Sequence, residues 1–163
     1  MVDISFEVNG RALTVSINVA DTLLHVLRNH ADLKGTRYGC GIEQCGACMV
    51  LVNGKPAYSC TFAAQDAGGQ SVTTIEGLGH GHGDEQTLHP VQAAFLDEQA
   101  GQCGYCLSGI IISATALLDA NPNPSRAEIV TALEPHLCRC GAHTRMLRAV
   151  ERAARSMREQ AVS

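Results

Sequence analysis

The sequence contains no tryptophan, and aromatic residues make up only 4% of its 163 residues. It also lacks an excess of positive charge, because the formal net charge is −4 at pH 7 and the pI is about 5.9. Nucleic acids select proteins with basic surfaces, so we expect no nucleic acid among the partners. Hydrophobic residues make up 45% of the chain, so an aliphatic core can form. A small domain with little aromatic bulk often needs a metal site or a disulfide as well.

A long hydrophobic run is also missing. The most apolar stretch, residues 107–118, is too short to cross a bilayer. Residues 1–7 alternate between polar and apolar types, whereas a secretion signal contains an apolar block. By its own signals the chain is therefore predicted to be cytoplasmic, with no direct membrane insertion. Partner subunits could still bring it to a membrane or carry it to the periplasm.

Eight cysteines are the outstanding feature of the composition. An even number allows four disulfides, but secreted disulfide scaffolds are usually shorter and richer in cysteine. Since no secretion signal is visible, metal binding is the better interpretation.

The first half of the chain has the pattern of two hairpins and one helix. Residues 4–8 and 12–19 alternate with period two around Asn9-Gly10, and residues 49–52 and 55–59 flank Asn53-Gly54. Between them, Asp21 or Thr22 can cap a helix whose leucines and valine share one face. A last strand is predicted over residues 72–75. This pattern indicates a compact α+β domain over residues 1–76.

The second half is predicted to be helical. Residues 77–89 are rich in glycine and have no periodicity, which is typical of a linker, and His80, His82 and His89 are expected to be solvated there. From residue 90 to 163 four helices are predicted, starting near Pro90, Leu107, Ser125 and Thr144. Together they would form a small helical bundle.

The first four cysteines have the spacing of a plant-type ferredoxin. Cys40, Cys45 and Cys48 form C-x₄-C-x₂-C, and Cys60 follows the second hairpin. Three thiolates from one short segment require the backbone to wrap around the metal centre, which the neighbouring glycines allow. Zinc bound by four thiolates is the alternative, but zinc sites favour two C-x₂-C pairs, and only Cys45 and Cys48 have that spacing. We therefore predict a 2Fe–2S cluster here.

The second four cysteines are less specific by spacing alone. Cys103 and Cys106 form C-x₂-C, Cys138 and Cys140 form C-x-C, and each pair lies between two predicted helices. The intervening helical hairpin would bring both pairs to one end of the bundle. Zinc and an iron–sulfur cluster would both be satisfied by four thiolates, although the C-x-C pair favours a cluster.

Taken together, the motifs resemble one family over nearly the whole chain. They are Gly39-Cys-Gly-Ile-Glu-Gln-Cys-Gly-Ala-Cys48, Ser59-Cys60, Thr74-Ile-Glu-Gly-Leu78, Leu88-His-Pro-Val-Gln92, Gln102-Cys-Gly-Tyr-Cys106 and Leu137-Cys-Arg-Cys140. The chain is similar to the small iron–sulfur subunit of the molybdenum hydroxylases, the xanthine dehydrogenase and aldehyde oxidoreductase family. The resemblance implies a β-grasp ferredoxin domain followed by a four-helix domain, each with a 2Fe–2S cluster.

The resemblance also implies partners and a direction of electron flow. The large subunit would hold molybdopterin, expected as the cytosine dinucleotide, and would hydroxylate the substrate. Electrons would pass through the helical-domain cluster and then the ferredoxin-domain cluster to FAD or to haem c on a further subunit. By similarity, Gln102 and Cys140 would lie beside the pterin.

Some positions depart from the family pattern. Glu43 stands where glycine is frequent, and Cys138-Arg-Cys-Gly-Ala-His143 replaces the usual Cys-Arg-Cys-Thr-Gly-Tyr. The second variant resembles the branch that oxidises N-heterocycles or aldehydes with a cytochrome acceptor, such as nicotinate dehydrogenase. Two other functions stay open on the residues alone: a free-standing two-cluster ferredoxin, and a zinc-stapled interaction module.

Overall fold

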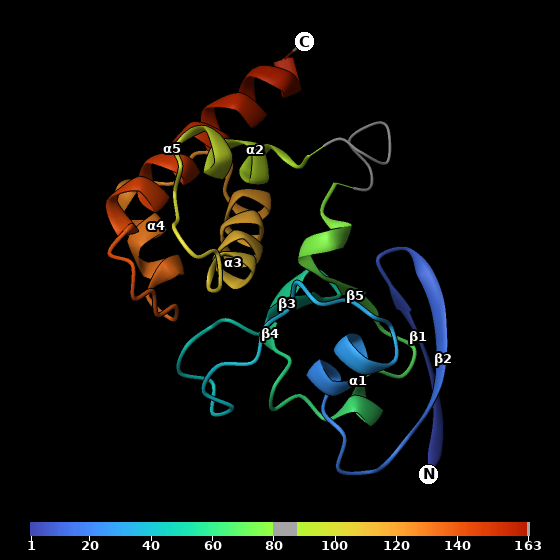
Figure 1. The fold of residues 1–163 in the computed structure, drawn as a ribbon. Coiled ribbons are helices and arrows are strands. Elements are labelled where there is room, and N and C mark those ends of the chain that lie inside the picture. Colours follow the sequence, from blue (N-terminus) through green and yellow to red (C-terminus); the bar gives the residue numbers. More distant parts are fainter. Residues whose placement is uncertain (80–87, 163) are drawn as a thin grey trace.

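The computed structural model describes residues 1–79 and 88–162, so most of the predicted linker, including His80 and His82, lies outside the described residues. The described chain forms a sheet-containing half and a helical half, which lie against each other (Figure 1).

Both predicted hairpins are confirmed. Each has a two-residue Asn-Gly turn in which both residues have positive φ: 51° and 75° at Asn9-Gly10, and 49° and 77° at Asn53-Gly54. This turn geometry matches the right-handed twist of the flanking strands. The four strands are β1 (Val2–Val8), β2 (Arg11–Ile17), β3 (Met49–Val52) and β4 (Lys55–Tyr58).

A fifth strand joins the two hairpins into one sheet. Strand β5 (Ser71–Thr73) runs parallel to β1 and antiparallel to β3, which gives the order β2-β1-β5-β3-β4. The prediction that this strand continues to Ile75 is wrong. The backbone N–H of Thr74 donates to the side chain of Asn9 at 2.9 Å instead of to a neighbouring strand, and a short 3₁₀ helix (Ile75–Gly77) begins there.

Helix α1 (Leu23–Asn29) covers one face of the sheet. Its N-cap is Thr22, whose hydroxyl accepts a hydrogen bond from the His25 backbone N–H at 3.3 Å. The apolar face of α1 and the inward side chains of the sheet form one buried core. Its largest members include Ile4, Phe6, Ile17, Leu23, Leu27 and Val50.

The four predicted helices of the second half are present. They are α2 (Pro90–Asp97), α3 (Leu107–Ala120), α4 (Arg126–Leu133) and α5 (His143–Val162). Ser125 and Glu128 form the predicted capping box at the start of α4. His89 is not solvated as expected: it is buried, and its Nδ1 accepts a hydrogen bond from the Val91 N–H as the N-cap of α2. His89 is buried because its side chain caps the first turn of α2.

Strand β3 lies between the two halves. All four of its residues are buried, so both faces of the strand are covered. Side chains alternate across a strand. Val50 and Val52 therefore enter the core under α1, whereas Met49 and Leu51 enter a second core that contains α2, α3 and α5. The sheet is covered on one face by α1 and on the other by the helical half.

The predicted fold class is confirmed: the chain is α+β, with a β-grasp ferredoxin half followed by a four-helix half. Among the described residues, none of the helices is long and apolar enough to cross a membrane.

Candidate metal centres

The first cysteine set lies on the loop between α1 and β3 and on the segment after β4. Cys40 and Cys45 are half-buried, whereas Cys48 and Cys60 are buried. The β3–β4 hairpin brings Cys60 back to the loop, and the Ser59 hydroxyl donates to the Cys48 carbonyl at 2.6 Å. The structure therefore brings the four predicted residues to one end of the sheet.

Backbone N–H groups in this loop point at sulfur. Ile42 and Gln44 donate to the Cys40 Sγ at 3.4 and 3.2 Å, and Cys40 donates to the Cys45 Sγ at 3.3 Å. The hydrogen bond from the Ile42 N–H is the largest effect on the Cys40 thiol and lowers its pKa. Desolvation raises the pKa, hydrogen bonds with Gln44 and Cys45 lower it further, and the net result is a pKa of about 7. Such donors stabilise an anionic sulfur centre.

The unusual Glu43 adopts the conformation that glycine would supply. Its φ is 61°, which is uncommon for a residue with a side chain, and its carboxylate accepts a hydrogen bond from the Thr61 hydroxyl. Thr61 directly follows Cys60, so this bond joins the two segments of the first cysteine set.

The second cysteine set gathers at the ends of the helices. Cys103 and Cys106 precede α3, and Cys138 and Cys140 lie between α4 and α5. All four line one cavity of about 190 Å³, together with Cys45 of the first set. The helical hairpin of α3 and α4 thus brings the two pairs together, and the two cysteine sets are neighbours.

The eight thiols lie in pairs. The Sγ atoms of Cys103 and Cys140 are 3.9 Å apart. Burial raises the pKa of Cys48 to about 12, and the adjacent Cys60 thiol contributes to this rise. Burial and the adjacent Cys138 thiol likewise raise the pKa of Cys106 to about 12. The fourth pair, Cys40 and Cys45, is joined by the N–H to sulfur bond described above.

Pairs of thiols fit a cluster of two iron atoms. In a 2Fe–2S cluster each iron is held by two protein ligands, so four thiolates approach as two pairs. Iron would replace the protons on the buried Cys48 thiol and the half-buried Cys106 thiol, and its positive charge would reduce the repulsion between neighbouring thiolates. Residues 1–79 and 88–162 contain no group of three or more His, Cys, Asp or Glu side chains that could hold a single metal ion.

Gln102 lies at the surface beside the second set. Its side-chain amide donates to the carbonyl of Cys140 at 3.4 Å. The side chains of Gln102, Cys103 and Arg139 are exposed. This edge of the second set can therefore touch a group carried by another subunit.

Two residues that the sequence did not single out as site residues link the two cysteine sets. The Tyr105 hydroxyl donates to the Tyr38 carbonyl at 2.6 Å, and the Arg37 guanidinium lies 5.5 Å from the centre of the Tyr105 ring. His136 is buried between the first-set loop and α3. A lone buried histidine in a Pro-His-Leu segment has no sequence pattern that marks it as part of a site.

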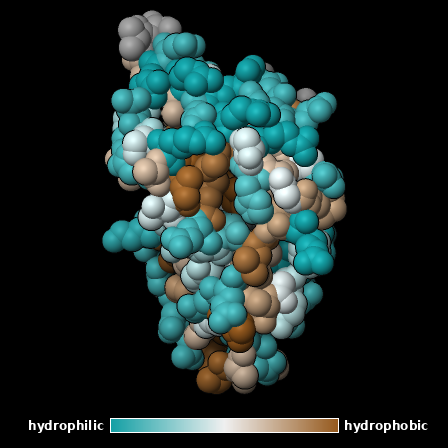
Figure 2. Space-filling view, turned by 90° about the vertical axis from the view of Figure 1, so that its left-hand side faces the viewer, coloured by the Kyte–Doolittle hydropathy of each residue, from teal (hydrophilic) through white to brown (hydrophobic). Residues whose placement is uncertain are grey.

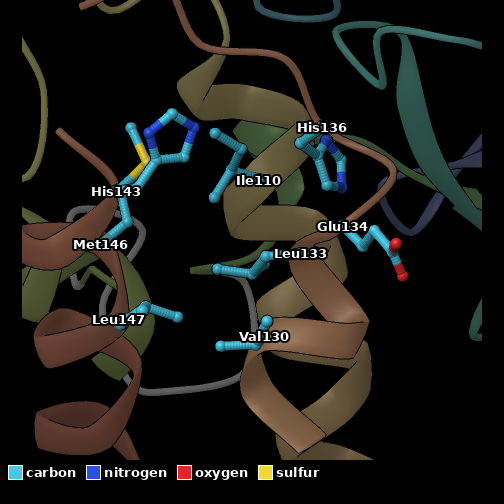
Figure 3. A pocket seen from close by; sticks show the side chains of 8 residues that line it. All are labelled: Ile110, Val130, Leu133, Glu134, His136, His143, Met146 and Leu147. Atoms are coloured by element: carbon cyan, nitrogen blue, oxygen red, sulfur yellow. The ribbon is translucent and has the colours of Figure 1, made fainter. Parts of the chain in front are cut away.

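An apolar groove lies between α3, α4 and α5. It is lined by Ile110 of α3, Val130 and Leu133 of α4, and Met146 and Leu147 of α5, with His143 at its edge (Figure 3). Viewed from the side of α4 and α5, hydrophobic side chains gather around a hollow in the surface (Figure 2). His143 is thus a helix-start residue that also borders this groove.

Comparison with known proteins agrees with this arrangement. The family described as "2Fe-2S iron-sulfur cluster binding domain" matches residues 6–72, and the "[2Fe-2S] binding domain" family matches residues 74–151. A nicotinate dehydrogenase subunit of Pseudomonas putida is 49% identical over 156 residues, covering 96% of this chain and 97% of its own. The alpha subunit of isoquinoline 1-oxidoreductase from Brevundimonas diminuta is 48% identical, covering 93% of this chain and 97% of its own.

A solved structure extends this similarity to three dimensions. The crystal structure of quinoline 2-oxidoreductase from Pseudomonas putida 86 contains a chain with a TM-score of 0.89 and 33% identity, covering 97% of this chain and 96% of that one. The predicted resemblance is therefore confirmed, and so is the electron-transfer role that it implied. The chain belongs to the small iron–sulfur subunits of the molybdenum hydroxylase family.

Proposed function

We propose that this electron-transfer subunit holds one 2Fe–2S cluster on Cys40, Cys45, Cys48 and Cys60 and another on Cys103, Cys106, Cys138 and Cys140. The paired thiols and the N–H donors of the first loop support the assignment. When bound, such a cluster takes up and releases one electron at a time. The chain's own residues hold the two sites next to each other and limit the access of water to the buried thiols of the first. We propose residues 1–76 and 90–163 as the two domains, joined by the linker 77–89.

The second set is proposed to face the large molybdenum-containing subunit. The observation that carries this orientation is the exposed surface beside that set, where Gln102 donates to the Cys140 carbonyl. An amide held in this way keeps a carbonyl oxygen and a second N–H for a polar ring on a partner. We therefore assign the pterin contact to Gln102 and Cys140, and we expect molybdopterin as the cytosine dinucleotide.

An N-heterocycle or an aldehyde is the proposed class of substrate. This proposal rests on relatives whose names contain nicotinate, isoquinoline and quinoline, and on an aldehyde oxidoreductase iron–sulfur subunit of Escherichia coli that is 40% identical. Substrate choice belongs to the large subunit. The electron acceptor is proposed to be a further subunit that carries FAD or haem c.

Purification from the native host tests the proposal. The chain should co-purify with a large subunit that contains molybdenum and with a flavin or cytochrome c subunit, identified by mass spectrometry. Iron analysis should give about four iron atoms per chain, since each of two clusters holds two. A chain that purifies alone, with zinc and without iron, would refute both the cluster assignment and the proposed complex.

A further inference from the structure

The tip of the first-set loop is packed directly against the helical half at Gly46, which lies between the ligand candidates Cys45 and Cys48. A Cβ atom at Gly109 of α3 would overlap the carbonyl oxygen of Gly46, and it would lie 3.0 Å from the Gly46 carbonyl carbon and 3.4 Å from the Ala47 Cα. Real Cβ atoms essentially never come within 3.0 Å of another heavy atom, as this one would with the Gly46 carbonyl oxygen. The loop can therefore approach α3 this closely only because residue 109 lacks a side chain.

The His136 ring packs against Gly46 from a second direction. A Cβ atom at Gly46 would overlap the imidazole ring of His136. The ring is itself fixed, because its Nε2 lies 2.7 Å from the Ser113 hydroxyl, one turn after Gly109 on α3. The Gly46 backbone therefore sits in a corner formed by α3 and a buried, anchored ring. In Figure 3, His136 lies beside α3, next to the groove that contains Ile110.

The same corner is connected to the second cysteine set by a hydrogen bond. Leu137, directly before Cys138, donates its backbone N–H to the carbonyl of Cys45 at 3.1 Å. One peptide segment thus carries the His136 ring against Gly46, the hydrogen bond to Cys45 and the ligand candidate Cys138. Any displacement of the loop relative to α3 changes the distance between the two cysteine sets.

We propose that Gly109 and His136 are positioning residues that set the spacing between the two cluster sites. The inference rests on the proposed cluster assignment and deepens it, since electron transfer between two centres slows steeply as their separation grows. Neither residue is a ligand candidate. Gly109 acts because it has no side chain, which leaves room for the Gly46 carbonyl, and His136 acts by filling the space beside Gly46. Packed interiors resist even one added methyl group, so a small change at residue 109 must move the loop.

The test uses the complete chain, loaded with iron, and compares Gly109→Ala with Gly68→Ala. The control adds the same methyl group outside the Gly46 corner, at a residue with φ −52° whose Cβ would have only the Gln65 carbonyl oxygen near it, at 3.3 Å. Dithionite-reduced samples are examined by EPR. The number of iron–sulfur signals reports the clusters, and the magnetic interaction between the two reduced clusters reports their separation.

We expect Gly109→Ala to keep two EPR signals while the splitting caused by cluster–cluster interaction narrows, and Gly68→Ala to match the wild type. Hydrogen exchange of the Leu137 amide should accelerate by roughly tenfold in Gly109→Ala, as its bond to Cys45 weakens. If Gly109→Ala does not retain iron, Ser113→Ala replaces it, because this change removes the His136 anchor without adding atoms and should have the same effect to a smaller degree.

The outcomes separate the two proposals. Two signals with an unchanged splitting and unchanged Leu137 exchange in the variants would overturn the positioning role and leave the cluster assignment intact. A wild-type chain with one signal or none would instead refute the cluster assignment.

Discussion

At the scale of single residues, Cys103 is the only cysteine of the eight that is exposed, and its sulfur lies 3.9 Å from that of Cys140. We predict that Cys103→Ser removes one of two EPR signals and stops turnover of the assembled enzyme, because an alkoxide is a poor replacement for a thiolate on iron. EPR of the reduced protein and an activity assay measure this. If both signals remained, the ligand assignment of the second set would be wrong.

Cys45→Ser provides the complementary variant at the first set. We expect it to remove the other EPR signal and to spare the cluster nearest molybdenum, which should still be reduced when substrate is added. The measurement is EPR after substrate addition under anaerobic conditions. If substrate no longer reduced the remaining cluster, the proposed order of the two sites would be reversed.

Gln102→Leu tests the surface contact without altering a thiol. The leucine has a similar size but loses the amide that donates to the Cys140 carbonyl at 3.4 Å. We expect iron content and both EPR signals to be unchanged. Reduction of the clusters by substrate should slow by about tenfold, the size of effect expected when the hydrogen bond between Gln102 and the pterin is lost. Gln65→Leu, at an exposed residue of the short 3₁₀ helix Ala64–Ala67, is the matched control. Equal rates in the two variants would contradict the pterin contact.

At the scale of elements, the capping box of α4 gives a prediction about stability. The Glu128 N–H donates to the Ser125 hydroxyl at 3.3 Å, and the Ser125 N–H donates to the Glu128 carboxylate at 2.7 Å. Ser125→Ala should lower the free energy of unfolding by about 1 kcal/mol, measured by denaturant titration. Ser125→Thr keeps the acceptor and is the control, and an equal loss in both variants would exclude the cap as the cause.

The carboxylate of this box adds a pH dependence. Hydrogen bonds from Ser125 lower the pKa of Glu128 below its ordinary value. A carboxyl group with a depressed folded-state pKa stabilises the fold above its unfolded pKa of about 4.3, and this stabilisation is lost as the pH falls through the folded-state pKa. The stability difference between the wild type and Glu128→Gln should therefore be constant near neutral pH and shrink only in acid.

Elements with local signals could be predicted from the sequence, whereas those set by distant contacts could not. Asn-Gly turns and the Ser125 box are complete within a few residues, so the hairpins and α4 were predicted closely. The end of β5 depends on Asn9, which is 65 residues away from Thr74, and the burial of His89 depends on the whole helical half.

The candidate site follows the same division. Cysteine spacing and the surrounding motifs predicted both thiol sets, and the structure brings the members of each set together. The corner around Gly46 was not predicted, since it depends on how closely α3 approaches a loop more than 60 residues earlier in the chain. No short pattern encodes that distance.

At the scale of the whole molecule, β3 makes the two halves depend on each other. Met49 and Leu51 are buried against the helices, so a chain of residues 1–76 alone would expose both. At about 1.5–3 kcal/mol for each buried side chain of this size, we expect the isolated segment to lose roughly 3–6 kcal/mol of stability. Guanidinium titration followed by circular dichroism measures the loss. Unfolding of the segment at the midpoint of the full chain would contradict this coupling.

The unequal accessibility of the two thiol sets determines which one is damaged first in a chain that has not yet met its partner. Oxidants and chelators reach Cys103 directly, while Cys48 and Cys60 are buried. If the second set holds iron and faces the large subunit as proposed, it is the set that sulfenic acid formation or loss of iron affects first before assembly. Overproduction of this chain alone in air should therefore yield protein that retains only the first cluster.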